Sequence, residues 1–75
     1  MVSPEQIRMA RAGLNWSATE LSQRAGLALA TVARFENGGG VTVATLEKME
    51  KALEKAGIVF IPKDSQGGVG VRLKK

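Results

Sequence analysis

The stretch that decides the fold runs from Ser17 to Gly38 and reads SATELSQRAGLALATVARFENG. It begins with the letters SATE, a capping box in which a serine hydroxyl and a glutamate three residues later satisfy free backbone N–H groups. Gly26 stands where a helix needs a left-handed residue to end, and Gly38 repeats that signal further along the chain. The stretch therefore predicts two short helices, at 18–25 and 29–37, joined by a turn that contains glycine.

Two short helices joined in this way form a helix-turn-helix pattern, whose second helix can enter the major groove of DNA. Val32 and Phe35 give the helix at 29–37 an apolar inward face. Its N-cap position falls on Ala28, whose side chain cannot accept a hydrogen bond, so sequence defines this end least well. Many corners between helices share the spacing, which alone favours DNA binding only moderately.

Helices are also predicted on both sides of this stretch. Ser3-Pro4-Glu5-Gln6 is a second capping box, with proline at the first helical position. We expect a helix over 4–12 that ends at Gly13. Thr42 can cap a further helix over 43–56, with Gly57 as its stop and with a buried stripe formed by Leu46, Met49, Leu53 and Ala56.

The end of the chain changes from helical to strand periodicity. Residues 58–61 read IVFI and are followed by Pro62, and residues 69–73 alternate apolar side chains with Gly70 and Arg72. The pair predicts a β-hairpin. A hairpin of this length is marginal by itself in water, so it must pack on the helices, on a second subunit, or on both.

Composition excludes most enzymatic chemistry. The 75 residues include no cysteine and no histidine, so there is no thiolate zinc site, cysteine nucleophile or imidazole base. We expect no catalytic residue, metal, cofactor or small-molecule substrate. No apolar run approaches the roughly 18 residues of a membrane span, and the first residues lack a signal-peptide pattern. The expected location is the cytoplasm, at the nucleoid when DNA is bound.

The net charge of +4 favours an anionic partner, but it is unevenly distributed. Residues 1–40 hold four arginines against three glutamates, a balance of +1. Residues 41–75 hold seven basic residues against four acidic ones, a balance of +3, with Arg72, Lys74 and Lys75 at the end. Charge is therefore weak support for DNA binding by the helix-turn-helix stretch.

The residues at 16–27 and 31–38 resemble the Cro and phage-repressor class of helix-turn-helix proteins, also called the xenobiotic-response-element family. Residues 7–11 resemble the first helix of that family, and residues 45–53 resemble the helix after the recognition helix. Residues 52–61 and 67–73 are similar to a compact bacterial subgroup with a C-terminal strand pair. The resemblance implies a mainly α, four-helix, lambda-repressor-like bundle at 1–57, followed in the same domain by a β-hairpin at 58–75.

The resemblance also implies where double-stranded DNA would bind. The helix start at Ser17 and Thr19 and the loop at Asn37, Gly39 and Gly40 match positions that meet phosphate. The base-reading positions match Ala28, Leu29, Ala30, Thr31, Ala33 and Arg34. Only two of these six are polar, and Ala18 stands where the family often has glutamine. Specificity would therefore come from Arg34, from contacts with thymine methyl groups and from DNA shape.

Three residues have more than one interpretation. Arg11 and Glu36 match an ion pair that joins the first and third helices in the family, although two solvated surface charges would read the same way in sequence. Leu29 could contact DNA, form an apolar patch with its alanine neighbours for a protein partner, or pack in the core.

The main hypothesis is a sequence-specific transcriptional regulator that binds DNA as a homodimer. A single small module buries little DNA surface, and the thin core of so short a chain favours a second copy. The predicted dimer contact is the hairpin, through Val59, Phe60, Ile61, Val69, Val71 and Leu73. The alternative is a protein-interaction module on the same fold, such as the antitoxin of a toxin–antitoxin pair.

Overall fold

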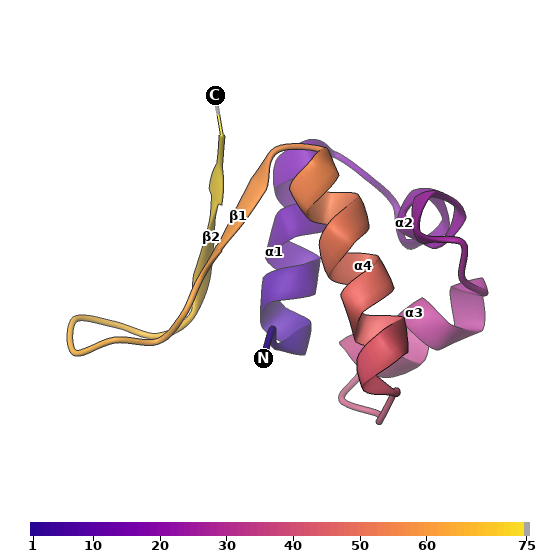
Figure 1. The fold of residues 1–75 in the computed structure, drawn as a ribbon, viewed down its shortest axis with the longest axis horizontal. Helices are drawn as coiled ribbons and strands as arrows, with labels where there is room; N and C mark the ends of the chain where they lie inside the picture. Colours follow the sequence, from indigo (N-terminus) through magenta and orange to yellow (C-terminus); the bar gives the residue numbers. More distant parts are fainter. Residues whose placement is uncertain (75) are drawn as a thin grey trace.

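The structure, a computed structural model, describes residues 1–74 and contains four helices followed by a hairpin (Figure 1). The helices are α1 (Pro4–Leu14), α2 (Ala18–Ala25), α3 (Leu29–Glu36) and α4 (Val43–Lys55), and the strands are β1 (Ile58–Ile61) and β2 (Gly70–Leu73). The predicted fold class, mainly α with a C-terminal hairpin, is confirmed. None of the helices within these residues combines the length and the apolar character needed to cross a membrane.

The first helix ends later than predicted. Gly13 lies inside α1, and Asn15 takes the left-handed conformation that closes the helix, with φ of 59°. Asparagine tolerates this region better than other side chains, because its short amide can bond locally. The N–H of Trp16 donates to the carbonyl of Arg11 at 2.9 Å, which completes a Schellman motif. The remaining boundaries of α2, α3, α4 and the strands agree with the prediction within one residue.

The core lies where all four helices and β1 meet. Its buried side chains come from every helix, and the largest fully buried ones are Ile7, Leu21, Val32, Met49 and Leu53. Ile58, at the start of β1, is buried with them, which ties the hairpin to the bundle. The predicted stripe of α4 is confirmed at Leu46, Met49 and Leu53, whereas Ala56 at its end is only half-buried.

The two strands pair antiparallel, with Ile58 opposite Leu73 and Ile61 opposite Gly70. Side chains on a strand alternate between faces. Phe60 and Val71, which stand opposite each other, pack against the core, so this face of the hairpin is turned toward the helices. The other face carries Val59, Ile61 and Arg72.

A glutamine fastens the hairpin to the start of α1. The buried side chain of Gln6 donates through Nε2 to the carbonyls of Ile61 and Gly70, each at 3.0 Å. Its Oε1 accepts from the N–H of Ser3 at 2.9 Å, so the same residue also completes the predicted capping box. One side chain therefore joins the first helix to both strands, a contact that the sequence did not predict.

Candidate nucleic-acid interface

The helix-turn-helix consists of α2, α3 and the turn between them, and backbone bonds define its shape. Ser17 caps α2 by accepting from the N–H of Glu20 at 3.0 Å. Gly26 has φ of 69°, and the N–H of Leu27 donates back to the carbonyl of Ser22 at 2.8 Å. This Schellman motif turns the chain sharply at Gly26 and directs it into α3.

The outward face of α3, the start of α2 and the loop after α3 carry the residues predicted to meet DNA. Val32, Phe35 and Glu36 are buried on the inner face. None of the eleven residues predicted to contact DNA is buried: they are exposed or partly exposed at Ser17, Thr19, Ala28, Leu29, Ala30, Thr31, Ala33, Arg34, Asn37, Gly39 and Gly40. Leu29 is 47% exposed, which argues against core packing as its role.

The start of α3 is also left open. Ala28 provides no side-chain cap, so the first backbone N–H groups of the helix have no side-chain acceptor. Free N–H groups at a helix start, together with the helix dipole, attract anions.

An ion pair anchors α3 to α1. Arg11 donates to both carboxylate oxygens of Glu36 at 2.7 Å and to the carbonyl of Trp16 at 3.0 Å. The paired carboxylate raises the pKa of the Arg11 guanidinium above its ordinary value, chiefly through this hydrogen bond. With its guanidinium engaged, Arg11 serves the bundle and is not a candidate for DNA contact.

A second arginine closes the far end of α3. Arg8 donates through Nη1 to the backbone carbonyl of Glu36, in the last turn of the helix, where carbonyls lack partners in the helix itself. Sequence reasoning missed Arg8. Its spacing of three residues from Arg11 places both on one face of α1, and that spacing is the signal that could have revealed it.

Arg34 lies beside the glycine loop that follows α3. Its Nε donates to the carbonyl of Gly40 at 3.3 Å, so the side chain is directed along the loop. Gly38 has φ of 90° and ends the helix, as predicted. The structure thus brings together one cation of the recognition helix and the loop predicted to meet phosphate.

Arg24 of α2 lies over the ring of Trp16, the residue that precedes the N-cap of this helix. The indole of Trp16 packs against the core, and the guanidinium of Arg24 lies 4.5 Å from the centre of its ring. Arg24 also pairs with Glu20 at 2.6 Å on the helix surface. The ring is therefore covered by protein on both sides, which makes it a poor platform for stacking on a base.

A family model described as a helix-turn-helix matches residues 7–57, most of the chain and all of the α2–turn–α3 unit. The chain belongs to this helix-turn-helix family. The family is the Cro/C1 type, so the chain is a DNA-binding regulator in its general class, with α3 in the place of the recognition helix. No curated protein matches the chain.

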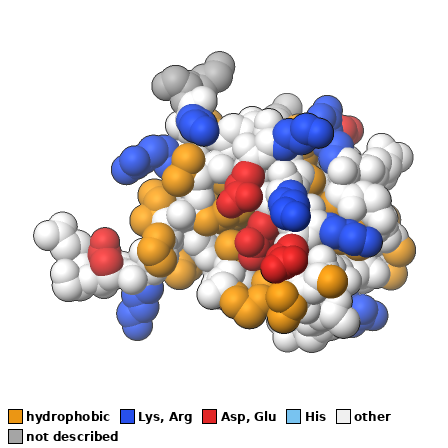
Figure 2. All heavy atoms as spheres, viewed as in Figure 1, with side chains coloured by type: hydrophobic (Ala, Val, Ile, Leu, Met, Phe, Trp, Pro, Cys, Tyr) orange, Lys and Arg blue, Asp and Glu red, His pale blue; other side chains and the backbone are white. Residues whose placement is uncertain are grey.

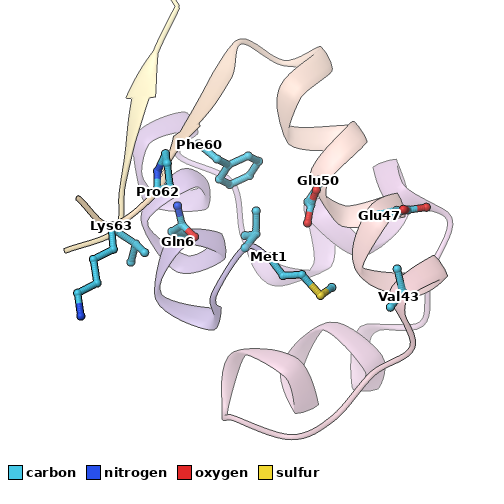
Figure 3. Close-up of a pocket in the computed structure, with 10 residues that line it drawn as sticks. Met1, Gln6, Val43, Glu47, Glu50, Phe60, Pro62 and Lys63 are labelled. Carbon is cyan, nitrogen blue, oxygen red and sulfur yellow. The ribbon is translucent and has the colours of Figure 1, made fainter. Parts of the chain in front are cut away.

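One groove takes none of its lining residues from α2, α3 or the turn between them. It has a volume of about 530 Å³ and runs between the N-terminal residues, α4 and the hairpin (Figure 3). Glu47 and Glu50 line it, and acidic side chains gather over α4 in Figure 2. Partial burial, with the charges of Glu54 and Glu47, raises the pKa of Glu50. Lys63 lines the same groove, so side chains of both charges meet there.

Proposed function

We propose that the protein is a sequence-specific transcriptional regulator that binds double-stranded DNA as a homodimer, in the cytoplasm. The observation that carries the proposal is the outward face of α3, where small side chains and Arg34 are exposed beside a glycine loop. Small residues allow the helix to enter the major groove, where alanine and leucine contact thymine methyl groups. The loop and the start of α2 would meet the phosphates on either side.

Binding to random duplexes tests the DNA part of the proposal. Selection from a randomised pool should return a palindromic consensus, because two copies related by a twofold axis read two half-sites. Affinity should fall linearly with the logarithm of salt concentration as counterions are released from the duplex. Absence of duplex binding near 50 mM salt would refute the proposal.

A substitution at Arg34 tests whether α3 contacts DNA. Arg34→Ala should weaken specific binding by about 1–3 kcal/mol, since its guanidinium is the main polar group on the outer face of α3. Lys55→Ala removes the same charge from the exposed end of α4 that leads into β1, at the opposite end of this helix from α3 (Figure 1). The Lys55 variant should keep the affinity and the base preference of the natural sequence.

The dimer contact is proposed for the outer face of the hairpin. Of the six residues predicted there, Phe60 and Val71 pack against the core, Leu73 shares their face opposite Ile58, and Val69 precedes β2. Val59 and Ile61 remain as the apolar pair on the free face. Val59 is 38% exposed, and a second copy of the chain would cover this apolar surface. Val59→Lys should therefore shift the protein toward monomer in sedimentation equilibrium, while Val43→Lys on α4 should not. A natural sequence that is monomeric at high micromolar concentration would rule out the dimer.

A second candidate function rests on the same exposed apolar residues. Leu29, with Ala28 and Ala30 beside it, could instead bind a protein, as in the antitoxin of a toxin–antitoxin pair. Leu29→Lys separates the two functions. Loss of a protein complex with duplex binding retained would favour the interaction module.

A further inference from the structure

Three consecutive glycines follow α3, and the structure gives each a different environment. Gly38 has φ of 90°, in a region that side chains other than glycine rarely adopt. Gly39 and Gly40 do not have such angles. Backbone conformation therefore accounts for glycine only at the first of the three positions.

Steric crowding accounts for glycine at the second position, Gly39. A Cβ added to Gly39 would lie 2.5 Å from Cγ of Arg34 and 2.9 Å from the Arg34 carbonyl oxygen, both too close for real contacts. A Cβ added to Gly40 would meet nothing within 4 Å. Gly39 thus leaves room for one particular side chain, whereas the neighbouring glycine does not.

Arg34 uses that room to lie along the loop. The N–H of Gly39 donates to the carbonyl of Arg34 at 2.8 Å, which draws the loop back against the last turn of α3. The Nε of Arg34 then donates to the carbonyl of Gly40 at 3.3 Å. Among residues 1–74, no hydrogen bond engages the two terminal nitrogens of this guanidinium, so they stay available for a ligand.

We propose that Gly39 is a positioning residue that sets the direction of Arg34 for DNA binding, a role that presupposes the DNA binding proposed above. With no side chain at 39, the stem of Arg34 packs over the loop and its Nε is held by Gly40. The guanidinium then enters the complex already oriented, and less side-chain freedom is lost on binding. Gly39 itself need not touch DNA for this role.

Four variants test the proposal by duplex binding: Gly39→Ala, Gly68→Ala, Arg34→Ala and the double variant at 39 and 34. Arg34→Ala should lose about 5- to 150-fold in affinity. Gly39→Ala should lose less affinity than Arg34→Ala. The double variant should lose no more affinity than Arg34→Ala alone. Gly68→Ala, the matched control, lies in the hairpin loop outside the proposed DNA surface and should bind within about twofold of the natural sequence, since its methyl group meets open space.

Stability measurements keep the test decisive if Gly39→Ala folds poorly. Removing the Arg34 side chain removes the Cγ that the new methyl group would meet, so the double variant should melt at a higher temperature than Gly39→Ala. The contact with the carbonyl of Arg34 remains, so the rescue should be partial. A double variant that is less stable than Gly39→Ala would overturn the proposal.

A readout without DNA separates this proposal from the proposed function. The Nε–H resonance of Arg34 should exchange slowly with water in the natural sequence and in Gly68→Ala, and faster in Gly39→Ala. If no variant binds DNA but this pattern holds, the proposed function fails and the positioning of Arg34 stands. Equal exchange in all three proteins, or affinity losses that multiply in the double variant, would refute the positioning role.

Discussion

The bond between Gln6 and the hairpin offers a sharp test of how the hairpin is held. In Gln6→Glu the side chain keeps its shape and can still accept from the N–H of Ser3, so the capping box survives. It loses both donors that reach the carbonyls of Ile61 and Gly70. Each neutral hydrogen bond contributes about 1 kcal/mol net, so at least about 2 kcal/mol of folding free energy should be lost at pH 7. For a chain of this size that corresponds to about 8–16 °C in melting temperature.

The loss should depend on pH in a defined direction. Burial and the two carbonyl oxygens disfavour a carboxylate at position 6, so its pKa in the folded variant is raised above the unfolded value of about 4.3. Destabilisation is therefore complete above the folded pKa. The destabilisation shrinks as pH falls from the folded pKa to below the unfolded pKa. There the carboxyl group is protonated in both states and can again donate one hydrogen bond.

Urea unfolding followed by the fluorescence of the single tryptophan, Trp16, measures both effects. The variant and the natural sequence should be compared at equal concentration, at pH 7 and at about pH 3.5. Gln23→Glu, the same substitution at an exposed position of α2, should change stability by less than about 0.5 kcal/mol. If Gln6→Glu is as stable as the natural sequence at pH 7, or loses the same amount in acid, Gln6 does not hold the hairpin.

Three further outcomes follow from contacts described above. Glu36→Gln should lower the thermal midpoint by an amount equivalent to about 1–3 kcal/mol, because it leaves Arg11 partly buried without its carboxylate. Asn15→Ala should destabilise by about 1 kcal/mol and Asn15→Gly should not, a contrast that chemical unfolding resolves, because the residue has a left-handed backbone. Glu50→Gln should raise stability at pH 7 and lose this advantage in acid. The raised pKa of Glu50 means that its favourable contribution is present below the unfolded pKa and disappears as pH rises through the folded pKa. A pH series of melting temperatures checks that sign.

Much of the fold could be predicted because its signals are local. Caps, glycine stops and apolar spacing each act within one helix, and α2 with its stop at Gly26 agrees with the prediction at both ends. Helix α1 was the exception, because glycine is only the commonest left-handed residue and asparagine at 15 takes that role instead. The pattern at 58–73 predicted the hairpin strands, but not which face would meet the helices.

The contacts between elements were harder to predict. The capping box accounts for Oε1 of Gln6 and predicts no partner for its amide nitrogen. A glutamate at that position would cap equally well, so the choice of an amide was the only signal of a second partner. Similarly, nothing in the letters GGG distinguishes Gly39 from Gly40, since the difference depends on where the side chain of Arg34 lies.

The hydrogen bonds of Gln6 also imply an order in which native contacts form during folding. Its partners lie 55 and 64 positions along the chain, whereas each helix closes through bonds between near neighbours. Contacts between distant positions form slowly, because the loss of chain entropy comes before the gain in contacts. On a ribosome the helices can form while later residues are still being added, but Gln6 must wait until Gly70 has been made and released. Until then the face of α1 that receives β2 is open to water or to other chains, so the interval between the synthesis of the helices and that of β2 is when this bundle is most exposed to aggregation.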